Sequence, residues 1–332
     1  MAILYTATRP ADFEWSASYL TSYKITTNTS KIDSSYVTHG LDASDGSVLN
    51  ARANHGEPSG NTLWFHFDFR YNSPNTPDDG SLLVIYDSLN KPVFYIDAVN
   101  GNLYAYVYGD ATSASTNINN IRTSRMDYDI SITVDGVNTT AKIYQRNQLI
   151  YEFSTPNAGT VEKPAYTIIQ MSDIGYSGGT SISQMIWADE NTRGMKMAEI
   201  PMDSLGIQTY SDWTGQVDNL FNNNDELYII SNNAPGNKFT STLATFNGET
   251  VGYEIKTVRM SSRAWKSLDS TITNFKHITR VGTTDYDSLT LHATNDQTRN
   301  NFQTDFPVNP ATTVGWTFGE VAVAEFGVKT EL

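Results

Sequence analysis

Three tyrosines at alternate positions form the pattern in this chain that is best suited to contact a ligand. In residues 103–108, LYAYVY, Tyr104, Tyr106 and Tyr108 alternate with smaller apolar residues. Alternate side chains of a β-strand point to the same face, so the tyrosines would form one row. Such a row can fill a core, anchor a subunit interface or stack on sugar rings, and we rank the interpretations in that order. If the smaller residues point to the core instead, the tyrosines lie on an outer face.

Acidic residues could hydrolyse glycans where they alternate along a strand, because alternation brings carboxyl groups to one face at the separation that a retaining mechanism needs. No E-x-D-x-E string occurs in this chain. Asp285-Tyr286-Asp287 has the nearest spacing, but we place it in a turn and it lacks a third acid. We interpret these two aspartates as turn-capping, solvated residues, and we expect no catalytic residue and no enzymatic activity.

The histidines show no spacing typical of a metal site. His66 alternates with apolar residues in residues 63–71, so we expect it on a polar strand face, solvated or at an interface. No G-x-S-x-G elbow, P-loop or dinucleotide motif occurs, and no Ser–His–Asp grouping can be assigned. The five histidines are His39, His55, His66, His277 and His292.

Two acidic loops are candidates for calcium. Asp42 with Asp45-Gly46, and Asp78-Asp79-Gly80, combine carboxylates with the glycine that tight loops around a hard cation use. Neither loop has the twelve-position pattern of an EF-hand. We prefer Asx-turns as the interpretation, so we expect no metal and no other cofactor, with calcium as the weaker alternative.

The segments expected to position these residues alternate apolar and polar side chains with a period of two residues. Residues 63–71 and 128–134 alternate apolar and polar side chains, and residues 81–86 (SLLVIY) form a continuous apolar run of strand length. Asp135-Gly136 and the turn at residues 146–148 indicate hairpins. Helical periodicity over ten or more residues is nearly missing, so the sequence predicts an all-β protein made of two antiparallel β-sandwich, jelly-roll-like domains.

The amino-acid composition changes after residue 199, where Pro201, Gly206 and Gly215 occur among Ser, Thr and Asp. We place a domain boundary near Pro201, dividing the chain into 1–200 and 201–332. Strands of the second part are expected at residues 226–231, 239–246, 252–260, 275–281 and 288–293.

One short helix is expected near the end of the second part. Thr317-x-x-Glu320 is a capping box, and Gly327 would stop the helix before a terminal strand at residues 328–331.

Composition excludes several classes of protein. The chain has 332 residues, no cysteine and a net charge of −14, which disfavours disulfides, cysteine metal sites and phosphate-contacting surfaces. The N-terminus lacks the basic and long apolar regions of a signal peptide, and no segment is apolar enough to span a membrane. We therefore expect a soluble protein made in a cytoplasm that neither binds nucleic acid nor enters membranes.

Three phrases resemble segments of bacteriophage virion structural proteins of the lectin-sandwich type. They are ADENTRGMK at residues 188–196, GYEIKTVRMSSRAWKS at residues 252–267 and NPATTVGWTFGEVAVAEFGVKTEL from Asn309. Trp213 and Trp316 match aromatic positions of such proteins, and we expect them in core or interdomain packing. The resemblance implies a laminin-G/concanavalin-like sandwich in residues 1–200 and a virion-attachment or assembly domain in residues 201–332.

The resemblance favours a non-enzymatic structural protein on the exterior of a phage particle, as a capsid decoration or a tail fibre or appendage. The alternative is a tail protein that binds a host-surface glycan, for which the tyrosine row is the local indication. We expect a homotrimer that contacts other virion proteins, because particle appendages follow particle symmetry. It would be assembled in the host cytoplasm and reside in the virion, with residues 201–332 attached to the particle and residues 1–200 outward.

Overall fold

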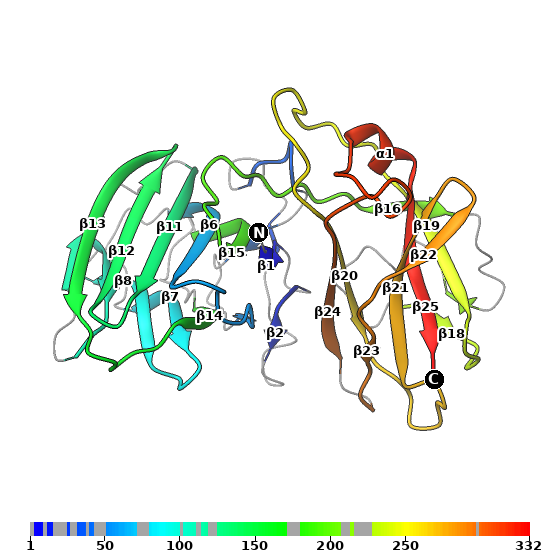
Figure 1. The fold of residues 1–332 in the computed structure, drawn as a ribbon, viewed down its shortest axis with the longest axis horizontal. Helices are drawn as coiled ribbons and strands as arrows, with labels where there is room; N and C mark the ends of the chain where they lie inside the picture. Colours follow the sequence, from blue (N-terminus) through cyan, green and yellow to red (C-terminus); the bar gives the residue numbers. More distant parts are fainter. Residues whose placement is uncertain are drawn as a thin grey trace. The chain divides into compact units, whose positions relative to one another are not determined.

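The computed structural model divides the chain into two compact units, Met1–Ala198 and Glu199–Leu332 (Figure 1). It describes residues 3–8, 12–15, 25–26, 32–37, 40–42, 51–71, 80–99, 102–110, 114–118, 125–170, 180–206, 213–215, 228–296 and 299–332. Both units consist of antiparallel sheets, which confirms the predicted all-β class. In the described part of the chain, no helix is long and apolar enough to cross a membrane.

The first unit contains an eight-stranded sheet and a seven-stranded sheet. In sheet order, the eight-stranded sheet has β13 (Gln148–Pro156), β12 (Asn138–Gln145), β11 (Met126–Val134), β6 (Thr62–Tyr71), β15 (Thr180–Ala188), β4 (Gly40–Asp42) and β3 (Ile25–Thr26), with β1 (Ile3–Ala7) paired to β15. The seven-stranded sheet has β10 (Ala114–Asn117), β9 (Asn102–Val107), β8 (Pro92–Val99), β7 (Gly80–Asp87), β14 (Pro164–Ile169), β5 (Ala51–Ala53) and β2 (Glu14–Trp15).

The inner faces of these two sheets share one hydrophobic core. Strand β6 contributes Leu63 and Phe65 from alternate positions, and Phe65 stacks on Trp187 of β15 with ring centroids 4.6 Å apart. The seven-stranded sheet contributes Ile85 and Phe94 to the same cluster. Because one core joins both sheets, the first unit is a jelly-roll-like sandwich, in agreement with the period-two pattern.

Both predicted hairpin turns are present. Arg146 and Asn147 have φ angles of 47° and 67° between β12 and β13, the left-handed conformation of a two-residue primed turn. At the β11–β12 turn, the Asp135 carboxylate accepts hydrogen bonds from the backbone N–H groups of Val137 and Asn138. These two turns fix the register of three neighbouring strands.

The second unit contains a six-stranded sheet and two two-stranded sheets (Figure 1). The larger sheet has the order β16 (Met202–Leu205), β19 (Lys238–Leu243), β25 (Glu325–Glu331), β21 (Asn274–Val281) and β22 (Thr284–Asp287), with β23 (His292–Ala293) paired to β21. The small sheets pair β17 (Trp213–Thr214) with β18 (Ile230–Ser231), and β20 (Val258–Ala264) with β24 (Asn300–Phe306).

Several strands expected in the second unit are shorter than predicted. Residues 252–257 are not strand, and only Ile230–Ser231 and His292–Ala293 are strand near the ends of two expected runs. Residues 226 and 227 of the first of these runs lie outside the described part of the chain. The pattern of alternation overestimated these strands because partner strands, which the local sequence does not reveal, decide where pairing ends.

The predicted helix is present as α1 (Phe318–Val323), with both hydrogen bonds of the capping box between Thr317 and Glu320. The prediction that Gly327 stops it is wrong, because Ala324 is the C-cap and Gly327 lies inside β25. A Cβ atom at Gly327 would lie 1.8 Å from the backbone oxygen of Phe239 on the neighbouring strand β19. Glycine is therefore required there by the close approach of two backbones.

Candidate functional site

The tyrosines of β9 and Tyr108, which directly follows it, point away from the core. Leu103, Ala105 and Val107 are fully buried and belong to the core of the first unit, whereas Tyr104, Tyr106 and Tyr108 are half-buried. Strand alternation then places the tyrosine row on the outer face of the seven-stranded sheet. Our first-ranked interpretation, that these tyrosines fill the core, is wrong for the row, although the Tyr108 ring also packs against the edge of the core.

Neighbouring strands extend this row. Tyr95 on β8 is the register partner of Tyr106, and the two rings stack with centroids 4.3 Å apart and an interplanar angle of 2°. The Tyr95 ring also stacks on Tyr108, with centroids 5.3 Å apart. We call the half-buried set Tyr86, Tyr95, Tyr104, Tyr106 and Tyr108 the tyrosine face.

One side of the tyrosine face is closed by a cation. Tyr86 on β7 stacks on Tyr166 of β14, with centroids 5.0 Å apart. Tyr166 is itself buried, and the guanidinium carbon of exposed Arg52 lies 3.9 Å above its ring centroid. A cation over an aromatic face is favourable, so Arg52 covers Tyr166 and leaves the rings on β7, β8 and β9 as the open part of the row.

The electrostatics of the tyrosine face favour neutral phenols. Burial is the largest cause that raises the pKa of Tyr86, Tyr95 and Tyr106 above the ordinary value for tyrosine. Neighbouring tyrosines raise the pKa of all three further, and Asp97 adds to the rise for Tyr95 and Tyr106. The hydroxyl groups therefore stay protonated at neutral pH and can both donate and accept hydrogen bonds.

The opposite sheet has a polar outer face that is covered by its own chain. His66 is 1% exposed, and its Nδ1 lies 3.0 Å from Asp129 Oδ1 on β11. Thr192, also buried, donates a hydrogen bond of 2.7 Å to the same oxygen. The expectation that His66 is solvated or at an interface is therefore wrong, because the segment at residues 189–196 packs over it.

The segment at residues 189–196 belongs to the first of the three resembling segments, at residues 188–196, and its side chains contact the eight-stranded sheet. The Arg193 guanidinium lies over the Tyr144 ring at 4.7 Å and over Trp64 at 5.8 Å. Lys196 donates to Asp127 of β11. These contacts, like the Thr192 hydrogen bond, hold the segment on the eight-stranded sheet. They account for its polar residues without a ligand.

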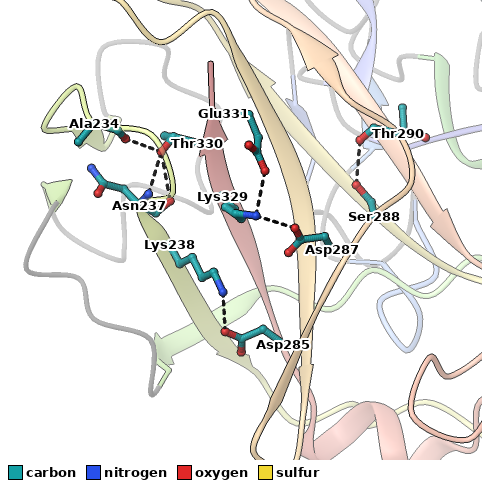
Figure 2. A network of polar contacts seen from close by, with 10 residues as sticks. All are labelled: Ala234, Asn237, Lys238, Asp285, Asp287, Ser288, Thr290, Lys329, Thr330 and Glu331. Atoms are coloured by element: carbon teal, nitrogen blue, oxygen red, sulfur yellow. Dashed lines mark hydrogen bonds and ion pairs between the residues drawn. The ribbon is translucent and has the colours of Figure 1, made fainter.

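The two aspartates with the spacing nearest to that of a glycosidase, Asp285 and Asp287, form ion pairs with lysines. Asp285 and Asp287 lie in strand β22 and not in a turn, which corrects our placement. Asp285 accepts from Lys238 at 3.1 Å, and Asp287 accepts from Lys329 at 2.7 Å. Figure 2 shows these ion pairs, which join β22 to β19 and to β25 of the six-stranded sheet. Each carboxylate therefore forms an ion pair within the second unit.

A buried histidine pair joins two sheets of the second unit. His277 Nδ1 and His292 Nε2 both lie 2.7 Å from Thr304 Oγ1, and His277 Nε2 lies 2.7 Å from Ser262 Oγ. Burial lowers the pKa of His277 to about 3, with His292 as a second cause, and it also lowers the pKa of His292. A histidine with so low a pKa is a poor general base at neutral pH. We therefore interpret the Ser262–His277 contact as a buried hydrogen bond that joins the two sheets. The sequence does not indicate this contact, because Ser262, His277 and Thr304 are separated in the chain and meet only when the strands pair.

The calcium candidates cannot be placed as a site. Asp45, Asp78 and Asp79 lie outside the described residues, as does the side chain of Asp42. Among the residues that are described, no group of three or more His, Cys, Asp or Glu side chains could hold a metal ion.

The two tryptophans of the resemblance pack inside the second unit. Trp316 is buried and donates from Nε1 to the Phe306 carbonyl oxygen at 2.9 Å. The Trp213 ring makes an edge contact with Phe239, with centroids 5.4 Å apart. Both contacts lie within the second unit and agree with the expected packing role.

No protein-family model and no curated protein matches the chain. Among solved structures, the chain is similar to the binding domain of Paraclostridial Mosquitocidal Protein 1, with 11% identity and a TM-score of 0.37 over 59% of this chain and 49% of that one. The matched region thus spans about half of that domain.

Two further matches have comparable scores. The exoplasmic/lumenal domain of VIP36, in a Ca²⁺/Man3GlcNAc-bound form, matches with 12% identity and a TM-score of 0.34 over 57% of this chain and 89% of that one. The catalytic domain of a glycoside hydrolase family 131 protein from Coprinopsis cinerea matches with 13% identity and a TM-score of 0.36 over 60% and 98%. Similarity at this distance carries no information on ligand or activity, and the resemblance to phage virion proteins stays a prediction.

Proposed function

We propose that this chain is a non-enzymatic glycan-binding protein and that the sugar is bound on the tyrosine face of the first unit. The observation that supports this proposal is the row of half-buried tyrosine rings on the outer side of β7, β8 and β9. Large aromatic side chains are costly to leave partly open to water, so a continuous row of them indicates a binding surface.

The geometry of the tyrosine face suits a sugar. The Tyr104 ring is tilted by 44° against Tyr106, so no parallel ring among the described residues covers it. Pyranose rings carry C–H groups on their faces and hydroxyl groups at their edges. Tyr104 can stack on the C–H face, while the protonated hydroxyl groups of Tyr95 and Tyr106 can exchange hydrogen bonds with sugar hydroxyls.

Polar side chains border the tyrosine face on the side of β10. Ser115 is the register partner of Tyr106 and Asn117 is the partner of Tyr104, and both are exposed. A few polar groups beside an aromatic surface are the usual composition of a small-ligand site. The stacking among the rings also fixes their positions before binding, which lowers the entropic cost of association.

A glycan array is the experiment that tests this proposal. We expect the full-length protein to retain at least one class of oligosaccharide, and the Tyr104→Ser/Tyr106→Ser variant to lose at least tenfold in affinity, which is about 1.4 kcal/mol. The matched control is Tyr253→Ser, which removes a tyrosine that is 38% exposed from the second unit. Binding that survives the double substitution, or binding to no glycan at all, would contradict the proposal.

A second proposal concerns the setting of this activity, the exterior of a phage particle. The second unit exposes large apolar side chains, with Val251 83% exposed and Leu289 fully so. Single exposed apolar residues are normal on a surface, but the second unit carries most of the large exposed apolar side chains among the described residues. We take this excess to favour an assembly role. The others in this unit include Leu205, Ile230, Leu268, Leu291, Val308, Val314, Val323 and Leu332.

The assembly role predicts a homotrimer, which light scattering can test. Subunits of particle appendages follow closed symmetry, and apolar surface is buried between copies. We expect a mass three times that of the 36.8 kDa chain at micromolar concentration. A monomer in this measurement, together with absence of the protein from purified particles by mass spectrometry, would contradict the particle role and leave the glycan proposal standing.

A further inference from the structure

We infer that Asp97 selects the ligand of the tyrosine face, and that this ligand is a glycan without carboxylate, phosphate or sulfate groups. The inference rests on the proposed function, because it concerns the same surface. It assigns a specificity role to a carboxylate on β8 that lies beside the tyrosines.

Asp97 lies within the tyrosine face by strand geometry. It is two residues from Tyr95 on β8, and strand alternation places both side chains on the same side of the sheet. Its register partner on β9 is Tyr104. The negative charge of Asp97 is one cause of the raised pKa of Tyr95 and of Tyr106, which agrees with close placement of the three groups.

The Asp97 carboxylate has an unused acceptor. Its Oδ1 atom is buried and has no hydrogen-bond partner among the residues that the structure describes. Buried polar atoms are nearly always hydrogen-bonded in native proteins, and an acceptor left without a donor is unfavourable. A donor supplied from outside the chain would satisfy this oxygen.

A sugar has the donors that this arrangement lacks. Vicinal hydroxyl groups, or the ammonium group of an amino sugar, can donate to a carboxylate while the C–H face of the ring packs on a neighbouring aromatic side chain. Charged hydrogen bonds of this kind are shorter and stronger than neutral ones. Asp97 therefore provides the polar contact and Tyr104 the apolar contact to one sugar ring.

The same carboxylate disfavours acidic glycans. A uronic acid, sialic acid or sulfated sugar would bring a second negative charge next to Asp97, and the protein as a whole carries a net charge of −14. Arg52, a cation on this side of the sheet, lies on β5 over Tyr166. Three strand spacings separate β5 from β8, which is about 14 Å, too far for Arg52 to neutralise an acidic group held at Asp97.

The test compares Asp97→Asn with the full-length wild-type protein on neutral, amino and acidic oligosaccharides, first on an array and then by titration calorimetry. We expect wild type to bind neutral or amino sugars and to exclude acidic ones. Asp97→Asn should bind the preferred sugar at least tenfold more weakly and should exclude acidic sugars less strongly. If the ligand is an amino sugar, wild-type affinity should also fall as salt is raised.

Controls separate this inference from the proposed function. Asp269→Asn removes an exposed carboxylate of the second unit and should change neither affinity nor selectivity. Unchanged melting temperature and near-ultraviolet circular dichroism would show that Asp97→Asn is folded. If Asp97→Asn binds as wild type while Tyr104→Ser/Tyr106→Ser does not, the Asp97 inference fails and the proposed function stands. Preference of wild type for acidic glycans also overturns the inference, and binding to no glycan overturns both.

Discussion

Replacing Gly327 by alanine is expected to unfold the second unit, or to destabilise it by about 3 kcal/mol or more. Gly327 lies in β25 between β19 and β21, opposite Thr240 and Ile278. The added methyl group would overlap the Phe239 backbone oxygen, 1.8 Å away. A backbone atom cannot move aside as a side chain does, so the strands must separate. Hydrogen exchange followed by mass spectrometry would report the loss of protection in β19, β21 and β25.

Gly319→Ala is the matched control for the Gly327 substitution. Gly319 lies in α1 of the same unit, and a Cβ there would meet nothing within 4 Å. Alanine is favoured over glycine in a helix by up to about 1 kcal/mol. We therefore expect Gly319→Ala to be neutral or slightly stabilising, and a Gly327→Ala protein with wild-type protection would contradict the close approach of the two strands.

Acidification is expected to destabilise the second unit through its buried histidine pair. The pKa of His277 is lowered from 6.5 to about 3, and that of His292 is lowered as well. The unfolded chain therefore binds more protons than the folded chain between these pKa values. Stability is full above pH 6.5 and falls as the pH drops toward 3, with a slope of about 1.4 kcal/mol per pH unit for each histidine that stays neutral.

Denaturant unfolding followed by hydrogen exchange at pH 7.5, 6 and 4.5 measures this slope in peptides of the second unit. The His277→Gln/His292→Gln variant keeps polar side chains but removes both titrations, so its slope should be much flatter. His55 in the first unit has a pKa lowered to about 4, mainly by burial, and contributes with the same sign there. Equal pH dependence of the second unit in wild type and variant would show that the pair does not titrate as its burial requires.

The features that depend on neighbouring residues in the chain were predictable from the sequence. Alternation in residues 63–71 and the Asp135-Gly136 turn correspond to β6 and to the β11–β12 hairpin. The capping box at Thr317 and Glu320 likewise starts α1. Each of these signals lies within a few residues, so the local physics is sufficient.

The features that depend on pairing between distant segments were not predictable. The tyrosine row of β9 was visible in the sequence, but Tyr86 and Tyr95 join it only because β7, β8 and β9 are neighbours in the sheet. His66 is buried by Thr192 and its neighbours, more than a hundred residues later in the chain. The sequence predicts a helix stop at Gly327 because nothing local indicates that β19 passes against it.

The most direct test of glycan binding is to map the ligand onto the protein. The full-length chain would be labelled with ¹³C at its tyrosine rings and titrated with the strongest oligosaccharide from the array. We predict chemical-shift changes at Tyr104, Tyr106 and Tyr95 that saturate with the calorimetric affinity, and none at Tyr144 or Tyr253. Saturating shifts confined to Tyr144, Tyr253 or other rings outside the tyrosine face would contradict the account.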